Sequence, residues 1–373
     1  MRRLALPISV SLLALTACVS DDTPETTGVD DWSVQVVADE LNIPWDLAVL
    51  PDGALLVTER SGEISIVSDG AVSEVAELDD VYDSGEAGLM SIALSTDFAD
   101  SGEFYVCSAT THGDVQVIPF TLSKDAGSAE RNESLLTGLP LAESGRHSGC
   151  RLLIGPDQML YIGVGDSAVG TNPQDLKSLG GKVLRIDPQT GEAPEDNPFA
   201  DSPHPKTQLI YTSGHRNVQG LAIQPGTDAI YSVEHGPTVD DEVNLLQPGA
   251  NYGWNPVGDG SYDESVPMTD ESIEAAVQAV WSTGGQTFAL SGATFLEGAT
   301  WGDAEGALAV AALKGSALYL VDLRDGGAEP AASKVPQLSD DYGRLRSVVD
   351  GGDGVIYVTT SNGTDDKILK VTP

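Results

Sequence analysis

Most of the residues that could carry chemistry lie in three short stretches of the chain. The first is Arg146-His-Ser-Gly-Cys-Arg151, which leads to Gly163-Val-Gly-Asp166. A histidine is a natural general base near neutral pH, and a carboxylate on its far ring nitrogen can fix its tautomer. Taken alone, a His-Ser-Gly stretch is also compatible with an ordinary turn histidine.

The other two stretches are Gly214-His-Arg-Asn-Val-Gln-Gly220 and Glu234-His-Gly-Pro237, the second followed by Asn251-Tyr-Gly-Trp254. The fork of an arginine binds carboxylates bidentately, although a lone basic residue is more often part of a surface salt bridge. The acidic run Asp240-Asp-Glu242 could supply oxygen ligands to a metal ion or form a solvated loop.

Three common kinds of site are disfavoured. The five histidines lack a close His-x₃-His arrangement and no Cys-x-x-Cys occurs, which argues against zinc. No Gly-x-Gly-x-x-Gly follows a strand in a βαβ context, and no Gly-x-Ser-x-Gly elbow is present. A nicotinamide enzyme and a serine hydrolase are therefore unlikely classes.

The elements that must position these loops form a loose repeat. A Gly/Asp/Pro turn is followed by an apolar strand with β-branched or aromatic residues. Its six copies begin near residues 51, 97, 155, 225, 305 and 352. This pattern predicts an all-β, six-bladed β-propeller over residues 32–373, with Ser33–Val37 completing the last blade. Seven or eight blades, with copies hidden in 163–224 and 237–304, are the alternative.

Composition limits the partners. The 373 residues include 57 acidic and 19 basic side chains, a formal net charge of −38, so a nucleic-acid partner is excluded. Arg2 and Arg3, an apolar run and Leu15-Thr-Ala-Cys18 predict a lipoprotein signal peptide over 1–18, with Cys18 as the lipidation site; an ordinary signal peptide is the alternative. The polar, acidic composition of residues 19–31 predicts a flexible tether. The protein is then exported to the bacterial cell envelope, periplasm or outer membrane, and touches a membrane only through its anchor.

Export also makes a disulfide between Cys107 and Cys150 plausible, because the compartment is oxidising. Two buried free thiols are the alternative.

From Leu41-Asn-Ile-Pro-Trp45 to the C-terminus, the chain resembles the glucose/sorbosone dehydrogenase family, which includes the soluble PQQ-dependent aldose sugar dehydrogenases. The resemblance rests on the order and spacing of several motifs. They are Gly88-Leu89, His147, Gly180-Gly-Lys-Val-Leu-Arg185, Asn197-Pro-Phe199, Gly214-His-Arg-Asn217, Glu234-His-Gly-Pro237, Asn251-Tyr-Gly-Trp254 and Arg344-Leu-Arg346. The family fold is a six-bladed propeller, in agreement with the repeat count.

The resemblance implies PQQ- and calcium-dependent oxidation of aldoses at the anomeric carbon. His147 matches the family's base, Asp166 the carboxylate that orients it, and Arg216 and Asn217 the pair beside the quinone. The electron acceptor would be a quinone or a small redox protein.

The remaining family positions concern cofactor binding. Lys314, Arg344 and Arg346 match anion-binding positions, and Thr287 matches a cofactor-side position. The family's calcium ligands include the backbone carbonyls of Gly236 and Pro237. Asp240, Asp241 and Glu242 could add ligands at this or another site.

One departure from the family bears on the function. Glu86 stands where the family commonly has Gln, and a carboxylate beside an anionic quinone costs energy unless calcium, an arginine or a proton compensates it. This favours the alternative of a cofactor-less propeller that binds a glycan or a protein. A weaker third possibility is a calcium-dependent lactonase. Cys150 also replaces a residue that is usually Gly.

Overall fold

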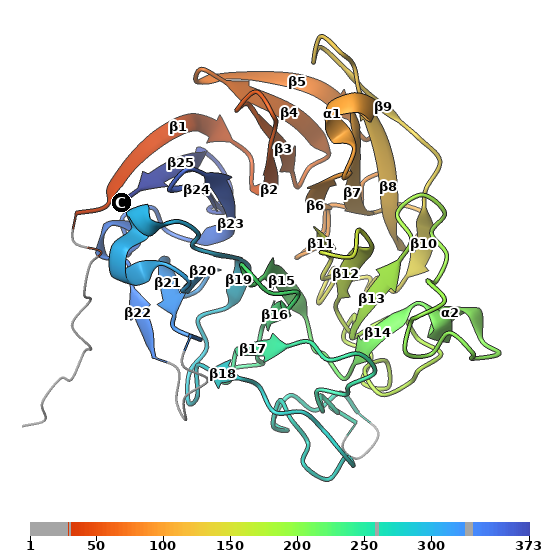
Figure 1. Ribbon diagram of the computed structural model, residues 1–373. Coiled ribbons are helices and arrows are strands. Elements are labelled where there is room, and N and C mark those ends of the chain that lie inside the picture. Colours follow the sequence, from red (N-terminus) through yellow and green to blue (C-terminus); the bar gives the residue numbers. More distant parts are fainter. Residues whose placement is uncertain (1–28, 30, 258–260, 325–330) are drawn as a thin grey trace, which may run out of the picture.

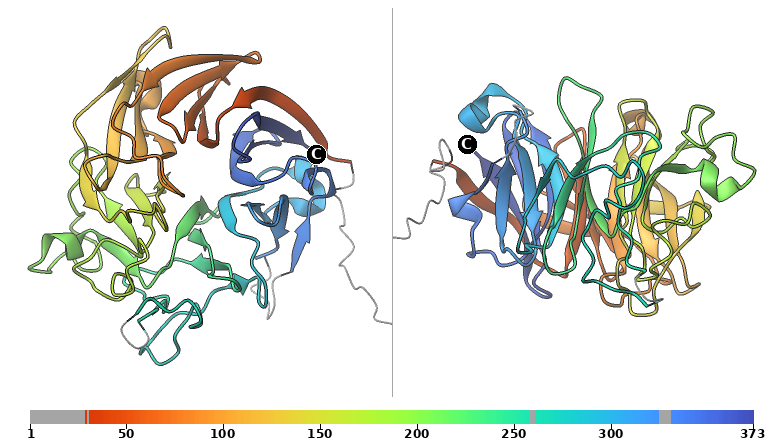
Figure 2. Two further views of the ribbon diagram at one scale, coloured as in Figure 1. Left: turned by 180° about the vertical axis from the view of Figure 1, so that it is seen from behind. Right: turned by 90° about the horizontal axis from the view of Figure 1, so that it is seen from below.

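The computed structural model describes residue 29 and residues 31–257, 261–324 and 331–373. Figure 1 looks along the axis of a ring of antiparallel sheets, and Figure 2 shows the same ring from behind and from below. Six sheets, five of four strands and one of five, are present in the described residues. The expected six-bladed β-propeller is therefore confirmed, and the described residues of 163–224 and 237–304 form no further sheet.

The strands occupy equivalent places in each blade. The innermost strands are β2 (Pro44–Val49), β6 (Leu89–Leu94), β11 (Arg151–Ile154), β15 (Val218–Ile223), β19 (Leu290–Phe295) and β23 (Leu345–Gly352). The second strands are β3 (Leu55–Glu59), β7 (Glu103–Ala109), β12 (Leu160–Val164), β16 (Ile230–Glu234), β20 (Leu308–Ala312) and β24 (Val355–Thr360).

Two further strands complete each blade. The third strands are β4 (Glu63–Ser68), β8 (Val115–Leu122), β13 (Lys182–Ile186), β17 (Glu242–Leu245), β21 (Ala317–Val321) and β25 (Asp366–Thr372). The outer strands are β5 (Ala71–Glu77), β10 (Leu136–Leu139), β14 (Ile210–Ser213), β18 (Trp281–Ser282), β22 (Ala332–Lys334) and β1 (Ser33–Leu41), and β9 (Ala129–Arg131) also pairs with β8.

The repeat seen in the sequence is the same hairpin in every blade. Each copy covers the connection between the innermost and the second strand, for example between β2 and β3 and between β11 and β12. Gly and Asp gather there because several of these turns need a positive φ, as at Gly53 (88°) and Gly226 (72°). The connections at the opposite pole vary in length, from residues 42–43 between β1 and β2 to residues 165–181 between β12 and β13, and such loops can carry other chemistry.

The ring is closed by its two ends. β1 pairs antiparallel with β25, from Ser33 opposite Thr372 to Leu41 opposite Asp366, as expected for the segment at Ser33–Val37. Val29 falls in the range 19–31 that we expected to be a flexible tether, yet its side chain is buried with Trp32 and Trp301. The expected signal peptide and Cys18 lie outside the described residues.

The core fills the spaces between blades rather than a single centre. One apolar cluster joins the blades that contain β7 and β12, with Tyr105, Val117 and Ile162 among its members, and others join the remaining neighbours. The helices are short: α1 (Phe98–Ser101), α2 (Pro205–Gln208) and the 3₁₀ turns η1 (Ala299–Ala304) and η2 (Pro336–Leu338). Within the described part of the chain, no helix has the length and apolar character needed to cross a membrane.

Candidate active site

The topology brings the candidate residues to one pole of the ring. Glu86, His147, Arg216, Thr287 and Arg344 all lie just before innermost strands. Three others, Asp166, Gly236 and Lys314, lie just after second strands. Because the innermost and second strands of a blade are antiparallel, the start of one and the end of the other share the same edge. Residues scattered over more than 250 positions thus reach the same pole.

The candidate base is buried and oriented. His147 is 2% exposed, and its Nδ1 lies 2.7 Å from Oδ1 of Asp166, as expected from their spacing. The carboxylate of Asp166 also accepts hydrogen bonds from the backbone N of Ala168, from Nε1 of Trp254 and from the hydroxyl of Tyr262, at 2.7, 2.8 and 2.7 Å. With Nδ1 held by this carboxylate, the imidazole keeps Nε2 as its basic nitrogen.

The backbone around His147 is held closely. His147 has a φ of 52°, and a Cβ added at Gly165 would lie 1.9 Å from its carbonyl oxygen. Cys107 of β7 and Cys150 form a disulfide with their Cα atoms 6.2 Å apart, which confirms the expected bridge. The loop that carries the base is therefore covalently tied to the neighbouring blade.

A second histidine–carboxylate pair occupies the equivalent place in the next blade. Nδ1 of His215 lies 2.9 Å from Oε1 of Glu234, again 19 residues apart in the sequence. Its Nε2 is already bonded to the hydroxyl of Thr212 at 2.8 Å, and its ring stacks on Tyr252. This second pair has no free nitrogen and serves to hold the strand ends together.

Arg216 lies between the backbone and an acidic side chain. Its Nη1 donates to the carbonyl of His235 at 3.0 Å, and its Nη2 to Oε1 of Glu264 at 2.6 Å. The same Glu264 oxygen accepts from Nη2 of Arg146 at 2.8 Å, and that Nη2 lies 3.4 Å from Nε2 of His147. A cation therefore stands beside the basic nitrogen of the imidazole.

Glu86 is surrounded by donors and cations. Its Oε2 accepts from the backbone N of His147 at 3.2 Å and from Nδ2 of Asn217 at 2.9 Å. Burial lowers the pKa of both Arg344 and Arg346, and the attraction of Glu86 partly opposes that shift. Glu86 therefore interacts electrostatically with these two arginines, although it forms an ion pair with neither among the described residues.

Arg346 is a buried cation with neutral partners. It is 5% exposed, its Nη1 donates to Oε1 of Gln219 at 2.9 Å, and its guanidinium lies 5.2 Å from the ring centre of Trp45. Burial lowers its pKa to about 9. No carboxylate forms an ion pair with Arg346 among the residues that the structure describes, and its Nε has no hydrogen-bond partner there. Arg344 and Lys314, by contrast, are exposed.

The acidic run Asp240-Asp-Glu242 is split between different partners. The buried Asp241 accepts from Gly236 N at 2.9 Å and from the hydroxyl of Thr287 at 2.7 Å, so it ties these two loops together. Asp240 accepts from Ser282, whereas Glu242 faces Asn244 in the interior. Over the described ranges, no three His, Cys, Asp or Glu side chains form a metal-binding group.

Four contributors were not assigned roles from the sequence. Trp254 lies in a motif that the resemblance quotes, but Tyr262 and Glu264 belong to the long connection between β17 and β18 and match no repeat. Burial and the negative charge of Asp166 raise the pKa of Tyr262, so its hydroxyl remains a donor. Arg146 belongs to the first of the three stretches singled out in the sequence, next to the base, but it was given no role there.

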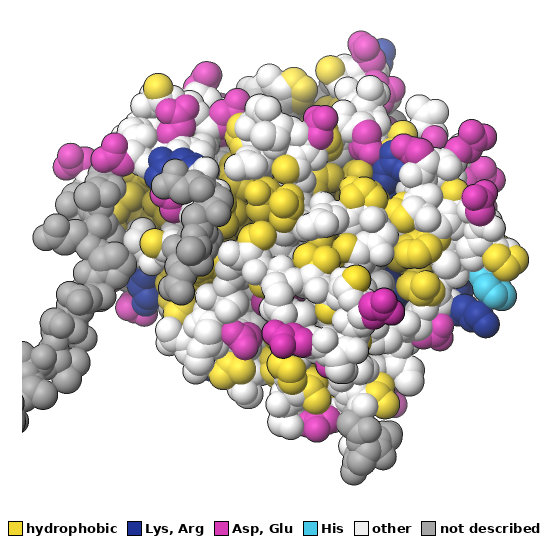
Figure 3. All heavy atoms as spheres, turned by 60° about the horizontal axis from the view of Figure 1, so that its bottom comes forward, with side chains coloured by type: hydrophobic (Ala, Val, Ile, Leu, Met, Phe, Trp, Pro, Cys, Tyr) yellow, Lys and Arg dark blue, Asp and Glu magenta, His cyan; other side chains and the backbone are white. Residues whose placement is uncertain are grey.

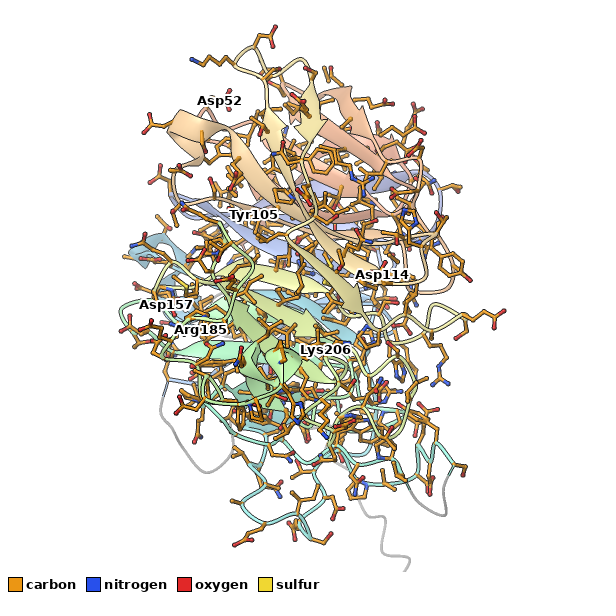
Figure 4. All side chains as sticks on the ribbon, turned by 90° about the vertical axis from the view of Figure 1, so that its right-hand side faces the viewer. Asp52, Tyr105, Asp114, Asp157, Arg185 and Lys206 are labelled. Carbon is orange, nitrogen blue, oxygen red and sulfur yellow. A yellow bond between two sulfur atoms is a disulfide. The ribbon has the colours of Figure 1, made fainter. Side chains whose placement is uncertain are left out.

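A groove of about 600 Å³ lies at the opposite pole, between the blades that contain β7 and β12. It is lined by Tyr105 and Glu133 among others. Figure 4 labels Tyr105, and also Asp157 and Arg185 of the next blade, which are not part of the lining. Arg185 pairs with Asp157 at 2.8 Å and bonds Asn197 at 2.9 Å, so these residues fasten a surface loop. The candidate base and its partners are absent from this groove.

Comparison with known proteins shows which family the chain belongs to. The family model for Glucose / Sorbosone dehydrogenase matches residues 41–370. The chain belongs to the glucose/sorbosone dehydrogenase family. It is 30% identical over 351 residues to aldose sugar dehydrogenase YliI of Escherichia coli K12, covering 91% of this chain and 93% of that protein. The expected family and enzyme class are both confirmed at this level.

Solved structures of the glucose/sorbosone dehydrogenase family have the same fold. A PQQ-bound aldose sugar dehydrogenase from Streptomyces coelicolor is 33% identical, with a TM-score of 0.76 over 91% of this chain and 98% of that one. The apo-form of the soluble aldose sugar dehydrogenase from Escherichia coli is 30% identical, with a TM-score of 0.81 over 92% and 99%.

Proposed function

We propose that this protein oxidises aldose sugars at the anomeric carbon, with PQQ as the hydride acceptor and calcium as a second cofactor. The observation that carries the proposal is the pole where the His147–Asp166 pair lies beside Arg216 and Asn217. The PQQ-bound relative from Streptomyces coelicolor supports the choice of cofactor.

The residues present fit an anionic quinone. PQQ carries three carboxylates, and the pole offers buried nitrogens without hydrogen-bond partners among the described residues: Nε of Arg216, Nε of Arg346 and Nε2 of His235. An arginine fork suits a carboxylate because it can bind bidentately. Lys314 and Arg344, exposed at the same pole, would add positive charge. The hydroxyl of Thr287 already donates a hydrogen bond to Asp241, so Thr287 would contribute to cofactor binding by ordering its loop.

The histidine would perform the proton transfer. Its Nδ1 is engaged by Asp166, so Nε2 would take the proton of the sugar hydroxyl at C1, and Asp166 would stabilise the resulting imidazolium. When bound, PQQ would supply the acceptor for the hydride that leaves C1. The Arg216 cation would stabilise the negative charge that develops during that transfer.

Calcium would bind backbone oxygens. The carbonyls of Gly236 and Pro237 follow β16 at the same pole, and no hydrogen bond from a described residue reaches either oxygen. Asp241 holds this turn through its bond to Gly236 N. Calcium prefers such hard oxygen ligands, and it would supply Lewis-acid polarisation of the quinone. Asp240 and Glu242 are possible additional ligands under this proposal.

Activity of the reconstituted protein tests the proposal. Apo-protein mixed with PQQ and calcium should reduce an artificial dye when given aldoses. His147→Ala should lower kcat about 100- to 10,000-fold, the usual contribution of a general base, and should leave PQQ affinity within a few-fold. The exposed His204→Ala is the matched control and should behave as the wild type.

The alternative of a cofactor-less binding module makes the opposite prediction. It requires that no aldose in a broad panel be turned over and that PQQ not bind. Turnover that survives in His147→Ala would also contradict the assigned base.

We further propose that the protein is exported and held in the cell envelope by a lipid on Cys18, and that it passes electrons to a quinone or a small redox protein. The sequence Leu15-Thr-Ala-Cys18 supports the anchor. Cys18→Ser should move the protein from the detergent-extracted membrane fraction to the soluble fraction. Equal membrane association of both forms would refute the anchor.

A further inference from the structure

The connection between β17 and β18 passes over the candidate base. We call residues 261–264 of this connection the strap. Tyr262 donates to Asp166 at 2.7 Å, and its hydroxyl lies 3.2 Å from Nδ1 of His147. Two residues later, Glu264 accepts from both Arg146 and Arg216. The strap therefore contacts the base, its orienting carboxylate and the neighbouring arginine.

Arg146 and Glu264 differ from the charged groups nearest the base, Asp166 and Arg216, because they face solvent. The side chains of Arg146 and Glu264 are 44% and 36% exposed, whereas that of Arg216 is 5% exposed. Nη2 of Arg146 lies 3.4 Å from Nε2 of His147. A molecule that presents a hydroxyl to Nε2 must therefore lie against Arg146 and the carboxylate that holds it.

Beside the base, two arginines pair with a single carboxylate. Two guanidinium groups share one carboxylate oxygen, Oε1 of Glu264, and Glu264 is the carboxylate that pairs with Arg146 in the described chain. Arg216 and Arg346 are assigned above to the cofactor. Glu264 thus holds Nη2 of Arg146, a donor that the carboxylate of an anionic sugar would otherwise use, and its own charge repels such a sugar.

We propose that Arg146 and Glu264 form the substrate-facing wall beside the base, and that Glu264 makes the site select uncharged aldoses over aldoses that carry a carboxylate. A neutral sugar can hydrogen-bond to both groups, donating to Glu264 and accepting from Arg146. This inference rests on the proposed function, because it specifies the substrate class of the same site.

The experiment compares kcat/KM for glucuronate and glucose in the holoenzyme. The wild type should prefer glucose. Glu264→Gln keeps the size and most hydrogen bonds of the side chain but removes its charge, so it should raise the glucuronate-to-glucose ratio by about tenfold or more. Arg146→Gln removes the cation and should lower the same ratio. Glu274→Gln, an exposed acidic residue of the same connection, is the matched control and should leave the ratio unchanged.

The outcomes separate this inference from the proposed function. A folded Glu264→Gln variant that turns over glucose with an unchanged ratio would overturn the selectivity role, as would a wild type that prefers glucuronate. If Glu264→Gln is inactive because Arg216 has lost its anchor, Arg146→Gln decides, and an unchanged ratio there overturns the inference. Failure of the wild type to oxidise any aldose would overturn both proposals.

Discussion

Two histidines in this protein have almost the same surroundings, and one contact distinguishes them. His147 and His215 each precede an innermost strand and each bond a carboxylate 19 residues later. The Nε2 of His215 is held by Thr212, whereas that of His147 has only the 3.4 Å approach of Arg146. A general base needs a free nitrogen, so the position of a single threonine hydroxyl separates the candidate catalytic residue from the structural one.

At the residue scale, Gly165 provides a direct test of how the base is placed. A Cβ at this position would lie 1.9 Å from the carbonyl oxygen of His147, which is incompatible with the present backbone. Gly165→Ala should displace the base loop and lower kcat about 100-fold, because small misplacements of catalytic groups have effects of that size.

The matched control for that change is Gly127→Ala, in an exposed turn where the nearest atom to an added Cβ lies 3.4 Å away. It should retain full turnover. Normal kcat in Gly165→Ala would show that the base loop tolerates movement and would contradict its assigned role.

At this scale the sequence predicts the residues whose neighbours in the chain form a motif. His147, Asp166, Arg216 and Asn217 come together as expected, because each lies at a fixed distance from a strand end. The sequence does not predict Tyr262 and Glu264, whose contacts depend on how a long irregular connection folds back. No local pattern encodes such a path.

At the scale of elements, the disulfide joins the blade of β7 to the loop before β11. It closes a separation of 43 residues, and loop-closure entropy of that size corresponds to about 4 kcal/mol of stability. The paired change Cys107→Ser with Cys150→Ser should lower the free energy of unfolding by about this amount in denaturant titrations.

The same pair of substitutions should reduce turnover more than it reduces PQQ affinity. The reason is that the disulfide lies in the loop of His147 and not in the loops of Arg216 and Arg346. Dithiothreitol on the wild type should reproduce both effects and should do nothing further to the double variant. If the variant matches the wild type in stability and turnover, the bridge has no role in placing the base.

The blades themselves are the part of the fold that sequence reasoning recovers best. Asp-Gly and Pro-Gly turns mark the hairpins between the first two strands, because they supply the backbone angles that tight turns need. Buried Val29 is a residue that the composition did not place in the folded part of the chain. Its neighbours are polar and acidic, yet it packs against Trp32, so composition alone misplaces the start of the folded chain.

At the scale of the whole molecule, positive charge is concentrated while negative charge is spread out. Acidic side chains are scattered over the face in Figure 3 and clearly outnumber Lys and Arg there. Of the 19 Lys and Arg residues in the sequence, at least five belong to the site pole: Arg146, Arg216, Lys314, Arg344 and Arg346. A protein of net charge −38 can bind a tricarboxylate only where such a local reversal exists.

The central claim is that this cationic pole holds a redox anion, and equilibrium titration of the apo-protein with PQQ in the presence of calcium tests it most directly. We expect saturable binding of one PQQ per chain. Arg346→Gln should weaken it by about tenfold to a hundredfold, the range for a lost charged hydrogen bond. The surface variant Arg131→Gln, whose partner is Asp80, should leave it unchanged. Absence of saturable binding, or equal affinity in all three proteins, would show that the cationic pole does not hold PQQ.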